Sequence, residues 1–273
     1  MSTVMDLFNL SGRVAVVTGG AGLLGSSFCR ILAQAGASVV IADLDEEAAS
    51  MLANALARDG LQATPYEVDV TSPESARGMV EAALKAFGRL DILVNCAALD
   101  PKFDPLHDGR QAGAFEDYPL ESWNQALSVN LTGTFLCCQA AVNPMLAQGG
   151  GSIINLCSIY GLVGPDQRIY ERPDQPPRYK PVYYSVTKAG VLGLTRYLAT
   201  YYAGQNLRVN ALTPGGVFND HDDAFVQAYS ARAVLGRMAE AHEMDGALLF
   251  LASDASAYMT GANLVVDGGW TAW

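Results

Sequence analysis

A tyrosine and a lysine four residues apart are the side chains best suited to proton transfer in this sequence. Tyr184 and Lys188 lie in a stretch with helical patterning, where residues four apart share one face, whereas Tyr183 points about 100° away. A tyrosine hydroxyl has a pKa of about 10, and a nearby ammonium lowers that value. The pair could therefore act as a general acid or base near neutral pH. By its spacing alone, such a pair is more often a solvated helix face.

A glycine-rich segment near the N-terminus could hold a phosphate group. Residues 18–25 read Thr-Gly-Gly-Ala-Gly-Leu-Leu-Gly, with Gly19, Gly22 and Gly25 at intervals of three. Glycines allow a tight turn and a close approach to a pyrophosphate, whose charge the N-terminus of a following helix favours. The spacing also occurs in ordinary turns, but its place between a predicted strand and a predicted helix is the one a dinucleotide site requires.

An acidic residue after the second predicted strand indicates which dinucleotide would bind. Asp43 lies 24 residues after Gly19, where an acid can bind the hydroxyls of the adenosine ribose. It would repel a 2′-phosphate, and neither residues 19–25 nor residues 44–47 contain a Lys or Arg to offset that repulsion. The sequence therefore predicts NAD rather than NADP. The alternative role of Asp43 is to cap the next helix, for which Asp45 is better placed.

The elements that must position these residues alternate along the chain. Short β-branched runs predict strands at 13–17, 38–42, 62–68, 92–95, 152–156, 207–212 and 263–266. Helical patterns lie between them at 23–34, 46–58, 73–87, 120–147, 182–203 and 240–252. Strands that are apolar throughout and separated by helices indicate a parallel sheet covered on both faces. We predict one domain over 1–273, an α/β Rossmann-type doubly wound sheet of about seven strands.

Three segments interrupt this alternation on the side where ligands bind in such sheets. They are two inserts, at about 100–118 and 164–181, and a loop at about 217–238. The inserts carry the charged residues Lys102, Asp104, His107, Asp108, Arg110, Arg168, Glu171, Arg172, Asp174, Arg178 and Lys180. This clustering predicts a polar substrate such as a sugar, a polyol or a phosphorylated derivative. Solvated surface loops or arms of an oligomer are the alternatives.

Composition excludes several other classes of protein. Seventeen basic and 28 acidic residues give a formal net charge of −11, which argues against nucleic acid or an anionic membrane as the partner. No secretory leader and no apolar run of about 18 residues is evident, so we expect a cytoplasmic protein. The five cysteines sit in apolar segments and predict buried thiols. We expect no metal, because His107, His221 and His242 are dispersed; a cation held by Asp220, Asp222 and Asp223 is the weaker reading of that acidic loop.

Further motifs occur in the order typical of one family, and with them the chain resembles the single-domain branch of the short-chain dehydrogenases/reductases over residues 10–269. The motifs are Asp69-Val70, Asn95-Cys96-Ala97-Ala98, Asn130 in Val-Asn-Leu-Thr-Gly, Ser158, Tyr184-x-x-x-Lys188 and Pro214-Gly215 with Val217. The resemblance implies a catalytic set of Asn130, Ser158, Tyr184 and Lys188. It implies cofactor contacts by Gly19, Gly22, Leu24, Gly25, Asp43, Asp69, Val70, Asn95, Ala97, Tyr184, Lys188, Pro214, Gly215 and Val217.

The family's chemistry is hydride transfer between NAD and a secondary alcohol or ketone. The resemblance implies that Tyr184 exchanges the alcohol proton, that Ser158 holds the reacting oxygen, and that Lys188 lowers the tyrosine's pKa. It also implies that Asn130 anchors a water linking Lys188 to solvent. A narrower resemblance, at residues 97–103, 214–219 and the two inserts, is to oxidoreductases of bacterial flagellin-glycan (nonulosonic acid) biosynthesis; steroid and acyl-carrier substrates stay open.

Three departures from the family pattern bear on local loop geometry rather than on the chemistry. Leu23 stands where the second glycine is common, Cys96 and Ala98 replace Asn and Gly, and the interval from Ser158 to Tyr184 is 26 residues. The glycine spacing also occurs in extended epimerases and dehydratases, although little chain follows Pro214 to build their larger substrate domain. A catalytically silent NAD sensor is the other alternative, but it would be expected to lack part of the catalytic set.

Two predicted helices indicate self-association. Helices 120–147 and 182–203 carry apolar residues on more than one face, which favours further burial. The resemblance implies that they pair across a two-fold axis, so we expect a homo-oligomer, either a dimer or a homotetramer. Trp270 and Trp273 could cover a neighbour's pocket or belong to the local core.

Overall fold

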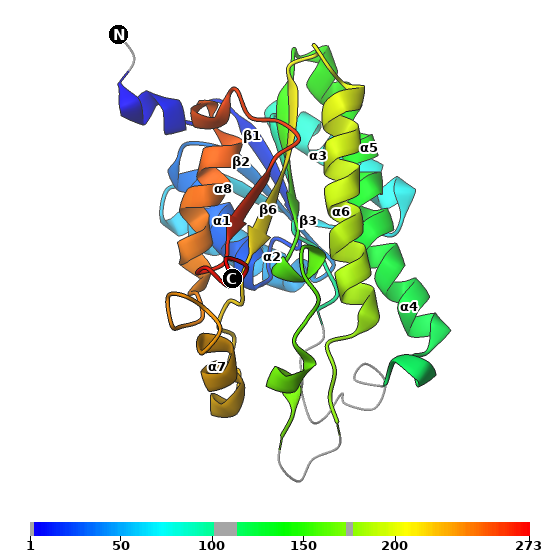
Figure 1. The fold of residues 1–273 in the computed structure, drawn as a ribbon. Coiled ribbons are helices and arrows are strands. Elements are labelled where there is room, and N and C mark those ends of the chain that lie inside the picture. Colours follow the sequence, from blue (N-terminus) through cyan, green and yellow to red (C-terminus); the bar gives the residue numbers. More distant parts are fainter. Residues whose placement is uncertain (1–2, 101–113, 173–176) are drawn as a thin grey trace.

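The computed structural model describes residues 3–100, 114–172 and 177–273. At its centre lies a seven-stranded parallel sheet, as predicted, and its strand order is β3-β2-β1-β4-β5-β6-β7 (Figure 1). The strands are β1 (Val14–Thr18), β2 (Ser38–Asp43), β3 (Ala63–Glu67), β4 (Ile92–Asn95), β5 (Gly151–Leu156), β6 (Leu207–Pro214) and β7 (Asn263–Val266). The strand order reverses between β1 and β4, and ligands bind at such a reversal, beyond the carboxyl ends of the strands.

Alternate side chains of the strands face two separate helical layers. Ala15 and Val17 pack into one core, and Val14 and Val16 pack into the other. The first core contains α1 (Leu23–Gln34), α2 (Glu46–Arg58) and α8 (Asp245–Ala252), and the second contains α3 (Pro73–Phe87), α5 (Thr134–Ala147) and α6 (Val182–Tyr201) (Figure 1). Burial on both faces explains why the strands are apolar throughout rather than alternating in polarity.

Helix ends follow local capping chemistry. The Asp45 side chain accepts a hydrogen bond from the Ala48 N–H at 2.9 Å and begins α2. Ser72 does the same for α3, whose first residue is Pro73, and Gly88 ends that helix in the left-handed conformation with φ 78°. These caps define the ends of the helices that return the chain from β2 to β3 and from β3 to β4.

The helix predicted over 120–147 is instead three segments. Between α4 (Leu120–Leu127) and α5, residues Ser128–Gly133 form a wider π-helical turn. Asn130 lies in this turn, and its amide accepts from the Leu99 N–H at 2.7 Å and donates to the Leu99 carbonyl at 3.1 Å. Apolar periodicity could not predict this turn, because one extra residue per turn leaves the apolar pattern of the helix nearly unchanged.

Two other segments differ from the prediction: one predicted loop contains a helix, and one predicted helix begins with a 3₁₀ turn. The loop at 217–238 contains α7 (Asp223–Ser230), whose N-cap Asp222 accepts from the Phe225 N–H at 3.0 Å. The helix predicted from 240 begins with a 3₁₀ turn, Ala241–Met244, before α8. Further 3₁₀ turns occur at Val4–Phe8, Phe115–Asp117, Ile159–Gly161, Gln167–Tyr170 and Asp254–Ser256.

Both α7 and the described part of the second insert lie beyond the carboxyl ends of the strands, in the lower part of Figure 1. Most of the first insert falls outside the described residues, as do Lys102, Asp104, His107, Asp108, Arg110 and Asp174. None of the helices in the described ranges has both the length and the hydropathy that crossing a membrane requires.

Candidate active site

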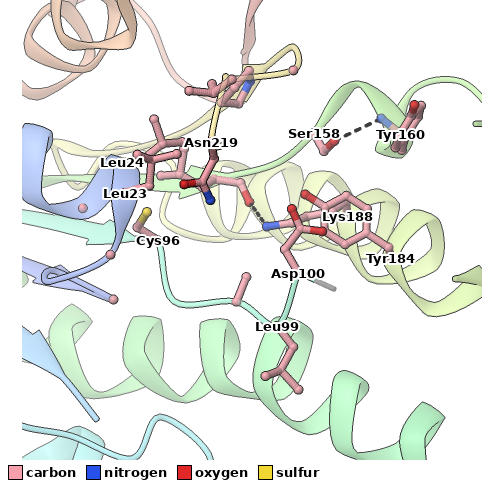
Figure 2. Close-up of a pocket in the computed structure, with 18 of the residues that line it drawn as sticks. Leu23, Leu24, Cys96, Leu99, Asp100, Ser158, Tyr160, Tyr184, Lys188 and Asn219 are labelled. Carbon is pink, nitrogen blue, oxygen red and sulfur yellow. Dashed lines mark hydrogen bonds between the residues drawn. The ribbon is translucent and has the colours of Figure 1, made fainter. Parts of the chain in front are cut away.

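A cavity of about 1140 Å³ opens at the carboxyl ends of the central strands. It brings together most of the predicted site residues, which come from six different strand ends and from α6. Its wall includes Gly19, Gly22, Leu24, Gly25, Asp43, Asp69, Val70, Ala97, Ser158, Tyr184, Lys188, Pro214, Gly215 and Val217. Figure 2 shows part of this wall. The cavity is long enough to join the glycine-rich turn to the Tyr184 region in one continuous space.

The glycine-rich turn is shaped so that side chains would block it. Gly19 has φ 62°, and a Cβ there would lie 2.8 Å from the Cα of Ala97. A Cβ on Gly25 would overlap the carbonyl oxygen of Gly19. The turn therefore presents bare backbone at the N-terminus of α1, where N–H groups can bind a phosphate. These features fit a dinucleotide pyrophosphate.

Asp43 lies on the cavity wall and does not cap α2, a role that belongs to Asp45 as predicted. Its carboxylate accepts from the Ala21 N–H at 2.9 Å and from the Asp45 N–H at 3.2 Å. These bonds hold the carboxylate beside the glycine-rich turn. A ligand hydroxyl could donate to the remaining acceptor positions, whereas a phosphate would be repelled.

Tyr184 and Lys188 lie one helical turn apart near the start of α6. The Lys188 Nζ donates to the Leu156 carbonyl at 2.9 Å and lies 5.8 Å from the centroid of the Tyr184 ring. Ser158 follows β5, and its hydroxyl accepts from the Tyr160 N–H at 3.2 Å (Figure 2). The strand end that supplies Ser158 thus also supplies the carbonyl that holds Lys188.

The surroundings of Tyr184 and Lys188 disfavour the ionised forms of both side chains. Desolvation raises the pKa of Tyr184 well above its ordinary value, and the nearby Asp100 carboxylate raises it further, while a hydrogen bond with Ser158 lowers it. Burial lowers the pKa of Lys188. Ionisation of the tyrosine therefore requires positive charge close to the phenol, because a desolvated anion is costly.

Two predicted site residues do not line the cavity. The Asn95 amide donates to the Asn155 side chain at 2.8 Å and faces the core. Asn130 holds the backbone of Leu99 through two hydrogen bonds, and its amide also donates to the Thr187 hydroxyl at 3.4 Å. Asn95 therefore acts within the core, and Asn130 acts on the backbone of Leu99, which borders the cavity.

One wall of the cavity is aromatic, which the sequence did not predict. The side chains of Tyr160, Tyr170, Phe225 and Tyr229 lie on it, with Met238. Behind them Trp270 is buried and stacks on Tyr229, with ring centroids 4.1 Å apart. Trp270 therefore belongs to the local core. Tyr160 comes from the turn after β5, Tyr170 from the second insert, and Phe225 and Tyr229 from α7. Because these segments have no periodic pattern, the sequence carries no local signal that their rings meet.

Ion pairs fasten the second insert around the cavity. Arg172 and Asp222 form a pair at 2.7 Å, Lys180 and Asp100 form one at 2.5 Å, and Arg232 pairs with Asp166. Three of these residues lie in the insert, and their partners lie after β4 and on or beside α7. The charges predicted to mark the substrate side are thus partly internal to the protein.

The remaining reactive groups show no metal chemistry within the described ranges. No group of three or more His, Cys, Asp or Glu side chains there could hold a metal ion. His221 lies on the cavity wall, stacks on Phe225 with centroids 4.8 Å apart, and accepts from the Asn219 N–H. All five cysteines are free thiols, and burial raises the pKa of Cys96 to about 11 and that of Cys137 to about 12.

Comparison with known proteins gives consistent relatives. A family model described as Enoyl-(Acyl carrier protein) reductase matches residues 21–271. Trans-4-hydroxycyclohexanecarboxylate dehydrogenase of Sinomonas cyclohexanicum is 39% identical, covering 100% of this chain and 97% of its own. D-threitol dehydrogenase of Mycolicibacterium smegmatis is 36% identical, covering 97% and 95%. A gluconate 5-dehydrogenase of Burkholderia cenocepacia, crystallised with NADP and tartrate, is 31% identical, with a TM-score of 0.87 and coverage of 99% and 100%.

The glycine-rich turn gives the first test of this site. Gly25→Ala should weaken dinucleotide binding at least about tenfold, because its Cβ would displace the Gly19 carbonyl. Gly246→Ala in α8 is the control, since a Cβ there meets open space. Isothermal titration with NAD measures both variants. Equal affinity of the two variants would show that the turn does not contact the dinucleotide.

Proposed function

The chain belongs to the short-chain dehydrogenase/reductase family, and we propose that it is an NAD-dependent enzyme that interconverts a secondary alcohol and a ketone on a small polar substrate. The observation that carries this proposal is the single cavity with a glycine-rich turn at one end and Tyr184 with Lys188 at the other. Binding a dinucleotide in that space would bring its reactive ring to the tyrosine. The relatives act on hydroxyl groups, as their names state.

The cofactor would be held by residues from several strand ends. The glycine-rich turn would bind the pyrophosphate, Asp43 the adenosine ribose, and Asp69 with Val70 the adenine. Ala97, Lys188, Pro214, Gly215 and Val217 would surround the nicotinamide and its ribose. When bound, the nicotinamide supplies the acceptor or the donor of hydride. We favour NAD over NADP because Asp43 would repel a 2′-phosphate, although one structural neighbour holds NADP.

Tyr184 would do the proton chemistry. In oxidation its phenolate accepts the hydroxyl proton of the alcohol, and in reduction its phenol returns that proton to the ketone oxygen. The Ser158 hydroxyl would hydrogen-bond the reacting oxygen and hold it in place. The ammonium of Lys188 lies close enough to favour the phenolate. Asn130 would act at one remove, by fixing the backbone of Leu99 beside the site.

The substrate that we propose is a hydroxylated compound such as a polyol or a sugar derivative. Threitol, in the name of one relative, carries only hydroxyl groups, whereas cyclohexanecarboxylate carries an anion. The cavity offers polar side chains on one side and aromatic rings on the other, which suits a carbon skeleton with several hydroxyls. The narrower resemblance to flagellin-glycan oxidoreductases is not tested by these relatives and stays a prediction. We also propose a cytoplasmic location.

The proton chemistry predicts opposite pH profiles for the two directions. The pKa of Tyr184 is raised, so the phenol stays protonated at neutral pH; reduction should be favoured there, and oxidation should accelerate as the pH rises. Tyr184→Phe should lower both rates at least about a hundredfold and leave NAD binding unchanged. Absorbance of NADH from pH 6 to 10, with calorimetry for binding, checks this. Retained turnover in Tyr184→Phe would remove Tyr184 from the role, and tight NAD binding with no turnover in the wild type would favour a sensor.

Cofactor preference predicts the behaviour of Asp43. The wild type should use NAD at least about a hundredfold better than NADP, and Asp43→Asn should reduce that ratio at least about tenfold by removing the repulsive charge. Asparagine keeps an oxygen that can accept from the Ala21 N–H. Asp45→Asn, two residues away at the cap of α2, is the control. The measurement is the ratio of kcat/KM with NAD to kcat/KM with NADP. A ratio near one in the wild type would contradict the proposal.

Exposed aromatic residues on α5 and α6 support self-association. Phe135, Tyr197 and Tyr201 are 44%, 60% and 63% exposed, which is unusual for such large apolar groups. We propose that this face is covered by a second copy of the chain, in a dimer or a tetramer. Sedimentation equilibrium should give a mass of at least twice 28.9 kDa. A concentration-independent mass of one chain would contradict this.

A further inference from the structure

An ion pair between Lys180 and Asp100 lies directly beside Tyr184. The Nζ of Lys180 lies 4.0 Å from the centroid of the Tyr184 ring, closer than the Nζ of Lys188 at 5.8 Å. The same Nζ lies 2.5 Å from Oδ1 of Asp100. Lys180 precedes α6 and Lys188 lies within it, so two ammonium groups from different segments lie near the phenol ring. Figure 2 shows Asp100 next to Tyr184 and Lys188.

Both members of this pair are held in place by other side chains. The Gln167 amide accepts from the Lys180 N–H at 2.8 Å and donates to the Lys180 carbonyl at 3.2 Å. Asn130 binds Leu99, the residue before Asp100, by the same two-bond pattern. The Lys180 side chain is only 10% exposed. Fixing a long lysine side chain costs conformational entropy, so this position is not that of a freely solvated surface charge.

The pair presents both a donor and an acceptor to the cavity. Lys180 and Asp100 line the wall, and the Asp100 side chain is 55% exposed. An ammonium only donates hydrogen bonds and a carboxylate only accepts them, whereas a hydroxyl does both. A hydroxyl placed against the pair can therefore accept from Lys180 and donate to Asp100 at once.

The charges around the cavity favour an uncharged ligand. The ammonium of Lys180 is balanced by Asp100, and the guanidinium of Arg172 is balanced by Asp222. Asp220 also lies on the wall. Arg178 and Lys188 line the wall as well. A carboxylate or phosphate that enters beside Lys180 or Arg172 would have to compete with Asp100 or Asp222 for that cation, which disfavours anionic substrates.

We propose that Asp100 and Lys180 bind a second hydroxyl of the substrate, on the carbon next to the one on which Tyr184 acts, so that the favoured substrates are uncharged vicinal diols. This inference rests on the proposed function and names its substrate class. The two oxygens of a vicinal diol lie ~2.8 Å apart, about one hydrogen-bond length. One oxygen can therefore reach the Tyr184 hydroxyl while its neighbour reaches an ammonium packed on the same ring. The aromatic wall of Tyr160, Tyr170 and Phe225 would contact the carbon skeleton.

The pair also acts on the tyrosine itself, which gives an independent readout. Groups around the phenol are Asp100 after β4, Cys157 and Ser158 after β5, Tyr170 and Lys180 in the insert, and Tyr183 and Lys188 on α6. The Asp100 carboxylate raises the pKa of Tyr184. Asp100→Asn should therefore shift the pH profile of oxidation toward lower pH. Lys180→Met removes a cation and should shift it toward higher pH, whereas a merely structural role would not give opposite shifts.

The experiment compares three compounds that share one ring: cyclohexanol, 1,2-cyclohexanediol and 2-hydroxycyclohexanecarboxylate. The wild type should show kcat/KM for the diol at least about tenfold above that for cyclohexanol, with the hydroxy acid the poorest. The ratio of kcat/KM for the diol to that for cyclohexanol should fall toward one in both Asp100→Asn and Lys180→Met. Asp100→Asn should also improve the hydroxy acid relative to the diol, because Lys180 is then unbalanced. Lys180→Arg should restore part of the preference.

Matched controls come from an exposed ion pair elsewhere on the molecule. Arg30 and Asp59 lie 2.9 Å apart and do not line the cavity, so Arg30→Met and Asp59→Asn should leave the substrate ratios unchanged. Calorimetry on Tyr184→Phe loaded with NAD measures diol and cyclohexanol binding without turnover. Equal affinity for the two compounds, or a wild-type ratio near one, overturns this inference. Selective diol binding with no oxidation of any alcohol would instead overturn the proposed function.

Discussion

The proposed function depends on the loss of a proton by the Tyr184 phenol in a site that little water reaches. Desolvation and the Asp100 carboxylate both raise the pKa of Tyr184, so the charged form needs compensation from fixed groups. Lys188 cannot move freely to provide it, since its ammonium is bound to the carbonyl of Leu156 at the end of β5. The helix that carries the phenol and the strand that holds its counter-charge must therefore keep one relative position. That requirement explains why the site is built on the ends of buried strands rather than on a free surface.

The parallel sheet satisfies this requirement by collecting strand ends on one edge. Residues far apart in the sequence, from Gly19 to Val217, share a single cavity because each follows a strand of the same sheet. The apolar layers on both faces keep that edge rigid, and the segments beyond it are free to vary in length. The second insert uses this freedom to bring Lys180 and Tyr170 to the site, and α7 brings Phe225 and Tyr229.

Much of the fold and half of the site could be predicted from the sequence, because their signals are local. The alternation of strand and helix patterns predicted the parallel sheet, and the four-residue spacing pointed to Tyr184 and Lys188. The pairing of Lys180 with Asp100 could not be predicted, since the two residues are 80 positions apart and lie in segments without periodicity. The π-helical turn was not predicted, because one extra residue in a helix that is apolar on several faces does not change its apolar pattern. Asn95 and Asn130 were found by type, but the direction of their side chains depends on tertiary contacts.

Different parts of the molecule are stabilised by different interactions, because three ion pairs hold the second insert in place. The sheet and helices are held by apolar burial, which added electrolyte does not weaken. The roof of the cavity is held partly by charges at the water boundary, such as Arg172 with Asp222 and Arg232 with Asp166. Dissolved ions screen exposed charges over about 8 Å at physiological ionic strength but over about 3 Å at 1 M, so charges in direct contact are weakened only by concentrated salt. Concentrated salt would therefore loosen the covering of the cavity while the underlying framework stays intact.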